Sequence, residues 1–106
     1  MSTMNTESAA ELDATLSGWA SGAAPLDKAA WLAWRAAWRA SYRALSARLR
    51  ELRIASRDPA ATASARGAAQ SARHYRRREA REMMDVLGRG KAARDAAVSK
   101  ARAAAQ

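Results

Sequence analysis

Apolar side chains recur along residues 25–57 at the spacing of one face of an α-helix. At about 100° per residue they fall within an arc of roughly 80°; they are Trp31, Trp34, Trp38, Tyr42, Leu45, Leu49 and Leu52. A second arc of roughly 80° lies directly beside the first and holds six arginines, namely Arg35, Arg39, Arg43, Arg50, Arg53 and Arg57. The pattern predicts one long helix, from about Pro25 to Arg57, whose apolar seam is flanked along its length by guanidinium groups.

The residues before this segment predict a shorter helix. Thr6 followed by Glu7 is typical of an N-cap with an acidic first turn. The stretch Ser21–Pro25 ends the short helix, and Pro25 suits the first turn of the long one, where its missing N–H costs nothing.

A third helix is predicted after Asp58–Pro59, because a residue before proline is pushed out of the α region. Asp58 is the expected N-cap of this helix, which should run to about Leu87. Its early apolar positions are alanines, and small residues facing the large ones of the long helix allow close antiparallel approach. Gly88–Gly90 should break the chain again.

These elements predict an all-α fold, either an antiparallel helical hairpin or a three-helix bundle. We expect an acidic N-terminal helix and loop in residues 1–24, the hairpin in residues 25–90, and an Ala-rich, charged helical tail in residues 91–106 that little holds in place. With 106 residues, nearly a third of them Ala, the chain supports one domain with a thin core. Such a core should complete its burial against a partner.

The charge is large and unevenly distributed. The whole chain carries a net charge of +9, yet residues 1–30 sum to −3 and residues 31–106 to +12. A field of one sign on this scale predicts an anionic partner: nucleic acid, a membrane surface or an acidic protein. Sixteen arginines against three lysines favour bidentate recognition of phosphate or carboxylate, although a GC-rich coding sequence explains the excess equally well.

Catalytic chemistry is not expected. The chain has no Cys, its one histidine is His74 among arginines, and it lacks the HExxH, Walker A and GxSxG motifs. Glu79 and Glu82 have Arg neighbours three or four residues away and are typical of helix-surface ion pairs. We therefore predict a binding protein with no catalytic residue, no metal and no cofactor of its own. No membrane-spanning run is present, and the acidic N-terminal segment argues against a cleaved presequence.

Two basic clusters are the candidate partner-binding regions: the arginine arc of the long helix, and Arg73–Arg78 with Arg81 on the third helix. For both, a solvated polar surface is the alternative. The candidate partner-binding residues are Arg39, Tyr42, Arg43, Arg50, Arg73, Tyr75, Arg76 and Arg77. The candidate apolar seam or interface consists of Trp31, Trp34, Trp38, Leu45 and Leu49.

Ser41-Tyr42-Arg43, with Leu and Arg recurring through Arg53, resembles the start of the LYR-motif family of small mitochondrial proteins. Tyr75-Arg76 is similar to the aromatic–Arg pair that follows later in that family, and Met84–Ala93 resembles its leucine–glycine–helix segment. The likeness spans roughly residues 34–98. Ser41 stands where the family has Leu, and the chain has no Phe at all.

The resemblance implies a three-helix adaptor on the matrix side of mitochondria, either an accessory subunit of a respiratory-type complex or an assembly factor. It would dock an acidic acyl carrier protein through Tyr42, Arg43, Arg76 and Arg77, and the partner's acyl-phosphopantetheine would be the only prosthetic group involved. Two other classes of function stay open on the residues alone. One is a ribosome- or chromosome-associated nucleic-acid-binding protein, and the other is attachment to a membrane surface through residues 26–45.

Overall fold

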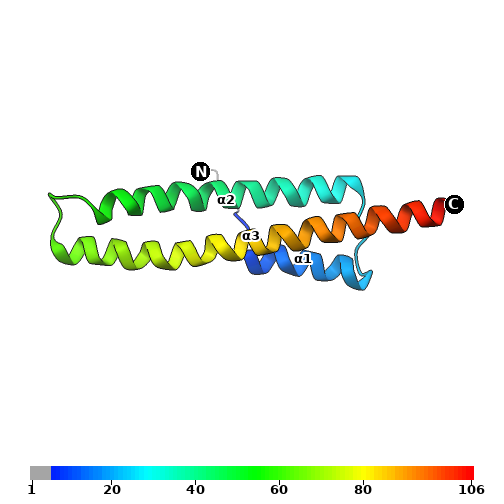
Figure 1. Cartoon of the computed structure of the whole chain (residues 1–106), viewed down its shortest axis with the longest axis horizontal. Helices are drawn as coiled ribbons and strands as arrows, with labels where there is room; N and C mark the ends of the chain where they lie inside the picture. The colour runs from blue at the N-terminus through cyan, green and yellow to red at the C-terminus, as the bar shows by residue number, and fades with distance from the viewer. Residues whose placement is uncertain (1–5) are drawn as a thin grey trace.

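The computed structural model describes residues 6–106, which form three α-helices and no strand. They are α1 (Ala9–Ser21), α2 (Lys28–Ser56) and α3 (Ala63–Ala105). The helices α2 and α3 form a long antiparallel hairpin, and α1 lies along one end of it (Figure 1). The predicted all-α fold is thus confirmed as a three-helix arrangement, elongated to 66 Å by 29 Å by 18 Å.

Helix α1 begins two residues later than its sequence suggests. Its N-cap is Ser8, whose hydroxyl accepts a hydrogen bond from Glu11 N (3.1 Å), while Ser8 N donates to Glu11 Oε1 (3.4 Å). This reciprocal capping box needs a Glu three residues after the cap, and Glu11 stands at that distance from Ser8. Thr6, the predicted cap, therefore lies outside the helix.

The cap of α1 gives a first prediction. Ser8→Ala should lower the free energy of unfolding by about 1 kcal/mol, the usual cost of losing a hydroxyl N-cap. Thr6→Ala should change it by less than about 0.5 kcal/mol, as surface substitutions away from such features do. Urea unfolding of the two variants measures both values, and an equal loss for the two would place the cap elsewhere.

The other two helices also begin later than predicted. Asp27 caps α2, its Oδ1 accepting from Ala30 N (2.8 Å), so Pro25 lies in the preceding loop. Asp58 does not cap α3; its carboxylate instead accepts from Ala60 N (2.9 Å) within the connecting turn. Thr62 takes the capping role by accepting from Ala65 N (3.1 Å).

The predicted break at Gly88–Gly90 is wrong, because α3 continues through both glycines to Ala105. Residues 91–106 are therefore a direct extension of α3 and not a separate tail. Gly90 is buried, and a Cβ at this position would overlap the six-membered ring of Trp34. Its glycine is required for close helix packing, and no turn occurs there.

The core lies where α1 covers the hairpin. Leu12 and Leu16 of α1 pack against α2 and α3 within a single buried cluster, whose other members are Trp31, Trp34, Trp38, Met83 and Val86. Each of two buried indole N–H groups donates to a backbone carbonyl: Trp34 to Leu12 O (3.1 Å) and Trp38 to Met83 O (2.8 Å). Trp side chains therefore tie α2 to both of its neighbours with their polar atoms satisfied.

Candidate functional site

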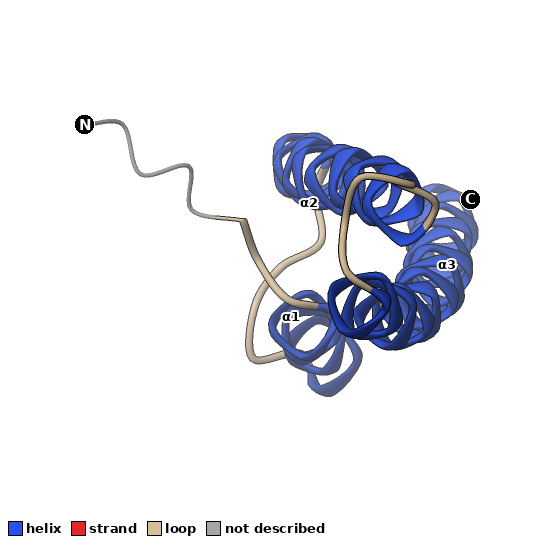
Figure 2. Cartoon of the chain, turned by 90° about the vertical axis from the view of Figure 1, so that its left-hand side faces the viewer, coloured by secondary structure: helices blue, strands red, loops and turns tan. Residues whose placement is uncertain are grey.

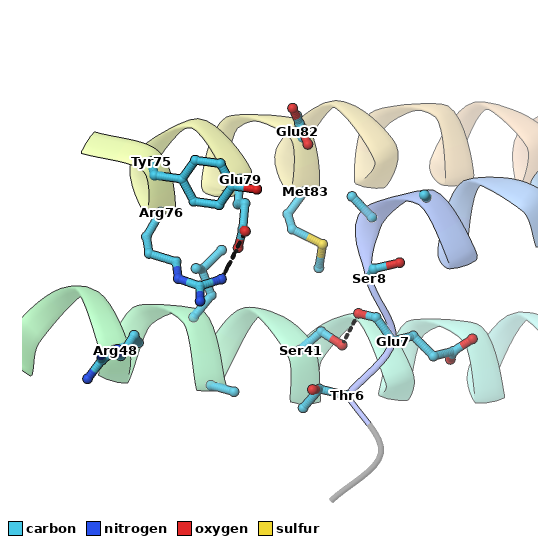
Figure 3. Close-up of a pocket in the computed structure, with 14 residues that line it drawn as sticks. Thr6, Glu7, Ser8, Ser41, Arg48, Tyr75, Arg76, Glu79, Glu82 and Met83 are labelled. Atoms are coloured by element: carbon cyan, nitrogen blue, oxygen red, sulfur yellow. Dashed lines mark hydrogen bonds and ion pairs between the residues drawn. The ribbon is translucent and has the colours of Figure 1, made fainter. Parts of the chain in front are cut away.

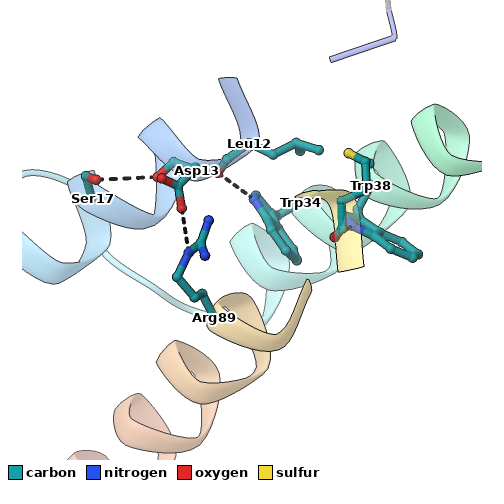
Figure 4. A network of polar contacts seen from close by, with 7 residues as sticks. Leu12, Asp13, Ser17, Trp34, Trp38 and Arg89 are labelled. Atoms are coloured by element: carbon teal, nitrogen blue, oxygen red, sulfur yellow. Dashed lines mark hydrogen bonds and ion pairs between the residues drawn. The ribbon is translucent and has the colours of Figure 1, made fainter. Parts of the chain in front are cut away.

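Helix α1 marks one side of the hairpin. Seen along the hairpin axis, α1 lies to one side of the α2–α3 pair (Figure 2). Ser41 of α2 donates to Glu7 O (2.7 Å), and Arg89 of α3 forms an ion pair with Asp13 of α1 (2.9 Å; Figure 4). These contacts fix which side of each long helix faces α1.

The arginines of the α2 arc lie on the other side. Trp38 faces α3, since its indole donates to Met83 O. At about 100° per residue, Ser41 lies about 60° from Trp38 toward α1, whereas Arg39 lies about 100° from it in the opposite direction. All six arginines of this arc are exposed, so they line the side of α2 that faces away from α1.

A second row of arginines, on α3, lies on the same side of the hairpin. Gly90 packs against Trp34 of α2; relative to it, Arg89 is rotated about 100° toward α1 and Arg77 about 140° the other way. Because α2 and α3 are antiparallel, the same sense of rotation from their line of contact brings both rows onto one face. We call this the basic face, formed by Arg35, Arg39, Arg43, Arg50, Arg53 and Arg57 of α2 with Arg73, Arg77 and Arg81 of α3.

The two rows complement each other along the hairpin axis. Trp38 is level with Met83, and Trp34 with Gly90. This register places the α3 arginines level with residues 40–51 of α2, where α2 contributes Arg43 and Arg50 to the face. Arg77, level with residues 44–47, lies in the gap between them. The basic face therefore continues with little interruption from Arg35 to Arg57, a distance of 22 helical steps, or about 33 Å at 1.5 Å per residue.

None of the nine guanidinium groups forms an ion pair or donates a hydrogen bond to another side chain or to the backbone within residues 6–106. The ion pairs in this part of the chain involve other arginines, namely Arg48, Arg76, Arg89 and Arg94. The helix positions on this side, from Arg35 to Arg57, also hold no Asp or Glu. Like charges at such spacing repel one another until an anion approaches.

Two shallow hollows on the basic face each combine one exposed aliphatic side chain with three arginines. In the first, of about 270 Å³, Leu32 lies beside Arg35, Arg39 and Arg43. The second, of about 620 Å³, has Ile54 beside Arg50, Arg53 and Arg57, with Asp58 and Pro59 at its edge. Leu32 is 49% exposed and Ile54 67%. We call these two concavities the Leu32 hollow and the Ile54 hollow.

A third concavity, the N-terminal groove, lies on the α1 side where α1 begins. It measures about 510 Å³, with Leu45 and Met83 among its apolar lining residues and Tyr75 and Arg76 on α3 (Figure 3). Arg76 is paired with Glu79 at 2.9 Å there. Charges of both signs line this groove, so it carries no strong preference for an anion.

The structure divides the predicted partner-binding residues between these surfaces. Five of them belong to the basic face: Arg39, Arg43, Arg50, Arg73 and Arg77. Tyr42 is half-buried and stacks on Trp38, with ring centroids 4.9 Å apart. Tyr75 and Arg76 lie across the hairpin in the N-terminal groove. Among the predicted seam residues, the three Trp side chains are buried and the two Leu side chains half-buried.

Sequence reasoning did not single out Leu32 and Ile54. Their signal was present, because both fall on or within about 20° of the arginine arc of the helical wheel. As aliphatic residues outside the apolar seam, they are the positions where a binding surface differs from a solvated polar one.

Residues 6–106 contain no group of three or more His, Asp or Glu side chains placed to hold a metal ion. No helix among them combines the length and the apolar character needed to cross a bilayer.

Comparison of the chain with protein-family models, with curated proteins and with solved structures gave no match.

Proposed function

We propose that this chain is a non-catalytic accessory or adaptor subunit that binds an acidic protein through its basic face. The observation that carries the proposal is the convergence of nine unpaired arginines from α2 and α3 on the side opposite α1. Arg is enriched in protein interfaces, where its planar guanidinium pairs with carboxylates in bidentate geometry.

Exposed aliphatic side chains favour a protein partner over nucleic acid. Leu32, Ile54 and Met84 are each about half exposed or more, and all three lie on the same side of α2 or α3 as the arginines. Phosphate contacts are electrostatic and would leave these side chains in water. An acidic protein that also offers apolar surface can cover them.

The burial of the tryptophans argues against attachment to a membrane surface. Trp31, Trp34 and Trp38 are at most 8% exposed, so they are not available to insert at the interface between lipid and water, where amphipathic helices place such residues. The arginines alone would give only a salt-sensitive attraction to anionic lipid.

The resemblance to the LYR-motif family names one acidic protein of this kind, the mitochondrial acyl carrier protein of a respiratory-type assembly. Of the four residues that the resemblance assigns to docking, Arg43 and Arg77 lie on the basic face. Tyr42 packs in the core and Arg76 pairs with Glu79 on the opposite side. In this form of the proposal, the carrier contacts Arg43 and Arg77 without the other two.

Affinity capture from native extract tests the proposal. The double variant Arg39→Glu/Arg77→Glu should lower partner recovery at least tenfold, because it replaces one cation of each arginine row of the basic face by an anion. The control Arg48→Glu/Arg78→Glu makes the same change of net charge outside the face and should recover the partner normally. The captured protein should be acidic, and nuclease treatment should not change how much of it is recovered. In purified form it should bind the chain again.

Two outcomes would contradict the proposal. Equal loss in both double variants would show that only net charge matters. Loss of the captured material on nuclease treatment, or recovery of ribosomal or chromosomal proteins, would instead support the nucleic-acid-binding alternative. Such binding should weaken steeply with salt, by nearly one log unit per phosphate contact for each decade of salt concentration.

A further inference from the structure

The Leu32 hollow and the Ile54 hollow repeat one arrangement at the two ends of α2. Each combines one exposed aliphatic side chain with three arginines of α2. In the sequence, the arginines follow Leu32 in the first hollow and lie on both sides of Ile54 in the second. Leu32 and Ile54 are 22 residues apart on the same helix, α2, which separates the hollows by about 33 Å.

The chemistry of a hollow specifies a mixed ligand. Guanidinium groups bind carboxylates through paired N–H···O bonds. The aliphatic side chain, together with the alkyl stems of the arginines, offers apolar surface to a hydrophobic side chain. A ligand that satisfies both has an aliphatic or aromatic residue with acidic residues on either side of it.

We propose that each hollow binds a short acidic peptide segment of the partner with one large apolar side chain flanked by carboxylates, and that the two hollows bind two such segments of one partner. This inference rests on the proposed function and specifies what the basic face recognises. Asp58 at the edge of the Ile54 hollow does not cancel the positive charge of the hollow, because three arginines outnumber it.

Other occupants fit the hollows less well. A nucleic-acid backbone would pair with the arginines but leave Leu32 and Ile54 uncovered. A second copy of the chain would bring another net charge of +9 against the first, and this repulsion opposes self-association.

Binding of a single labelled peptide tests the chemistry of one hollow. The probe is a peptide of about ten residues with one central Leu and two Glu on each side, titrated by fluorescence anisotropy with the full-length chain. Replacing its Leu by Ala should weaken binding roughly tenfold, and replacing its four Glu by Gln should abolish it, because both parts of the ligand are used.

Variants of the protein locate the contact. The double variant Leu32→Ala/Ile54→Ala should weaken the Leu peptide about five- to tenfold and leave the Ala peptide unchanged. Both side chains are exposed, so the fold should persist, and circular dichroism checks this. Val98→Ala is the matched control, because it shortens an exposed aliphatic residue of α3 that lies outside both hollows.

Tandem peptides test the pairing of the hollows. Two copies of the Leu motif joined by about 36 Gly/Ser residues have a root-mean-square span near 33 Å and should bind about 100-fold more tightly than one copy. Two Glu-Glu-Leu-Glu-Glu motifs joined without a linker place their Leu residues five positions apart, which spans at most about 18 Å, and should add only the roughly twofold statistical gain. Leu32→Ala or Ile54→Ala alone should reduce the long tandem to nearly the affinity of the single motif.

The outcomes separate this inference from the proposed function. If Arg39→Glu/Arg77→Glu abolishes peptide binding but the Leu32→Ala/Ile54→Ala variant binds normally, the hollows are overturned and the acidic-protein proposal stands. Equal affinity of the short and long tandems overturns the pairing. If the charge reversals also leave binding unchanged, both proposals fail.

Discussion

Gly90→Ala should destabilise the fold by about 3 kcal/mol, the upper end of the usual range for adding a methyl group to a tightly packed core. The added Cβ would overlap the six-membered ring of Trp34. That ring cannot easily move, because Trp31 stacks on it with ring centroids 5.4 Å apart and its N–H donates to Leu12 O. Relief therefore requires α3 to shift away from α2, which separates the helices where the core is thickest.

Gly88→Ala is the matched control two residues earlier on the same helix. Nothing lies within 4 Å of a Cβ at Gly88, so the change should raise stability by up to about 1 kcal/mol, since Ala is the better helix former. Urea unfolding followed by far-ultraviolet circular dichroism compares the two variants. Stability changes of the same sign and size would show that α2 and α3 are not in close contact at Gly90.

This pair of glycines also shows what a single sequence leaves undetermined. Helix α2 and its apolar seam were predictable, because a spacing of three and four residues is a local signal of amphipathic helix. The role of Gly90 depends on Trp34, 56 residues away, and a glycine that admits a neighbouring ring has the same sequence signature as one that breaks a helix. Because the contact with Trp34 cannot be seen in the sequence, the glycines predict a break in the helix.

The helix starts were recoverable in part. Glu11 stands three residues after Ser8, and this spacing of the capping box favours Ser8 over Thr6. At the start of α3, Asp58–Pro59 is an equally good cap signal, but the turn uses the Asp58 carboxylate locally and the helix begins after Thr62. Competing local hydrogen bonds of this kind are not ranked by sequence pattern.

The sequence predicts each of the two arginine rows of the candidate site but not their combination. The arginine row of α2 could be read from one helical wheel, and so could a basic cluster on α3. Their union on a single face depends on the antiparallel register and on the side taken by α1, which only the fold supplies. The fold also places Tyr42 and Arg76 outside the surface formed by Arg43 and Arg77.

Trp38→Ala should lower the free energy of unfolding by about 4 kcal/mol, within the range for truncating a buried Trp. Trp38 is 8% exposed, stacks on Tyr42 and donates to Met83 O across the α2–α3 interface. Domains of this size are stable by only about 5–15 kcal/mol, and the Ala-rich core offers few large side chains to refill the cavity. The variant should therefore be largely unfolded at temperatures that the parent chain tolerates.

Trp38→Phe separates packing from hydrogen bonding at this position. Phe retains much of the buried ring but no N–H, so it should cost about 1–2 kcal/mol, the smaller cavity plus one lost hydrogen bond. Tyr75→Ala removes an aromatic side chain that is 61% exposed on α3 and should stay within about 0.5 kcal/mol of the parent. Chemical unfolding of the three variants should give the largest loss for Trp38→Ala, a smaller one for Trp38→Phe and the smallest for Tyr75→Ala.

A loss below about 1 kcal/mol for Trp38→Ala would contradict a hairpin joined through Trp38. The register between the two rows of arginines would then rest on the contact of Trp34 with Gly90 alone.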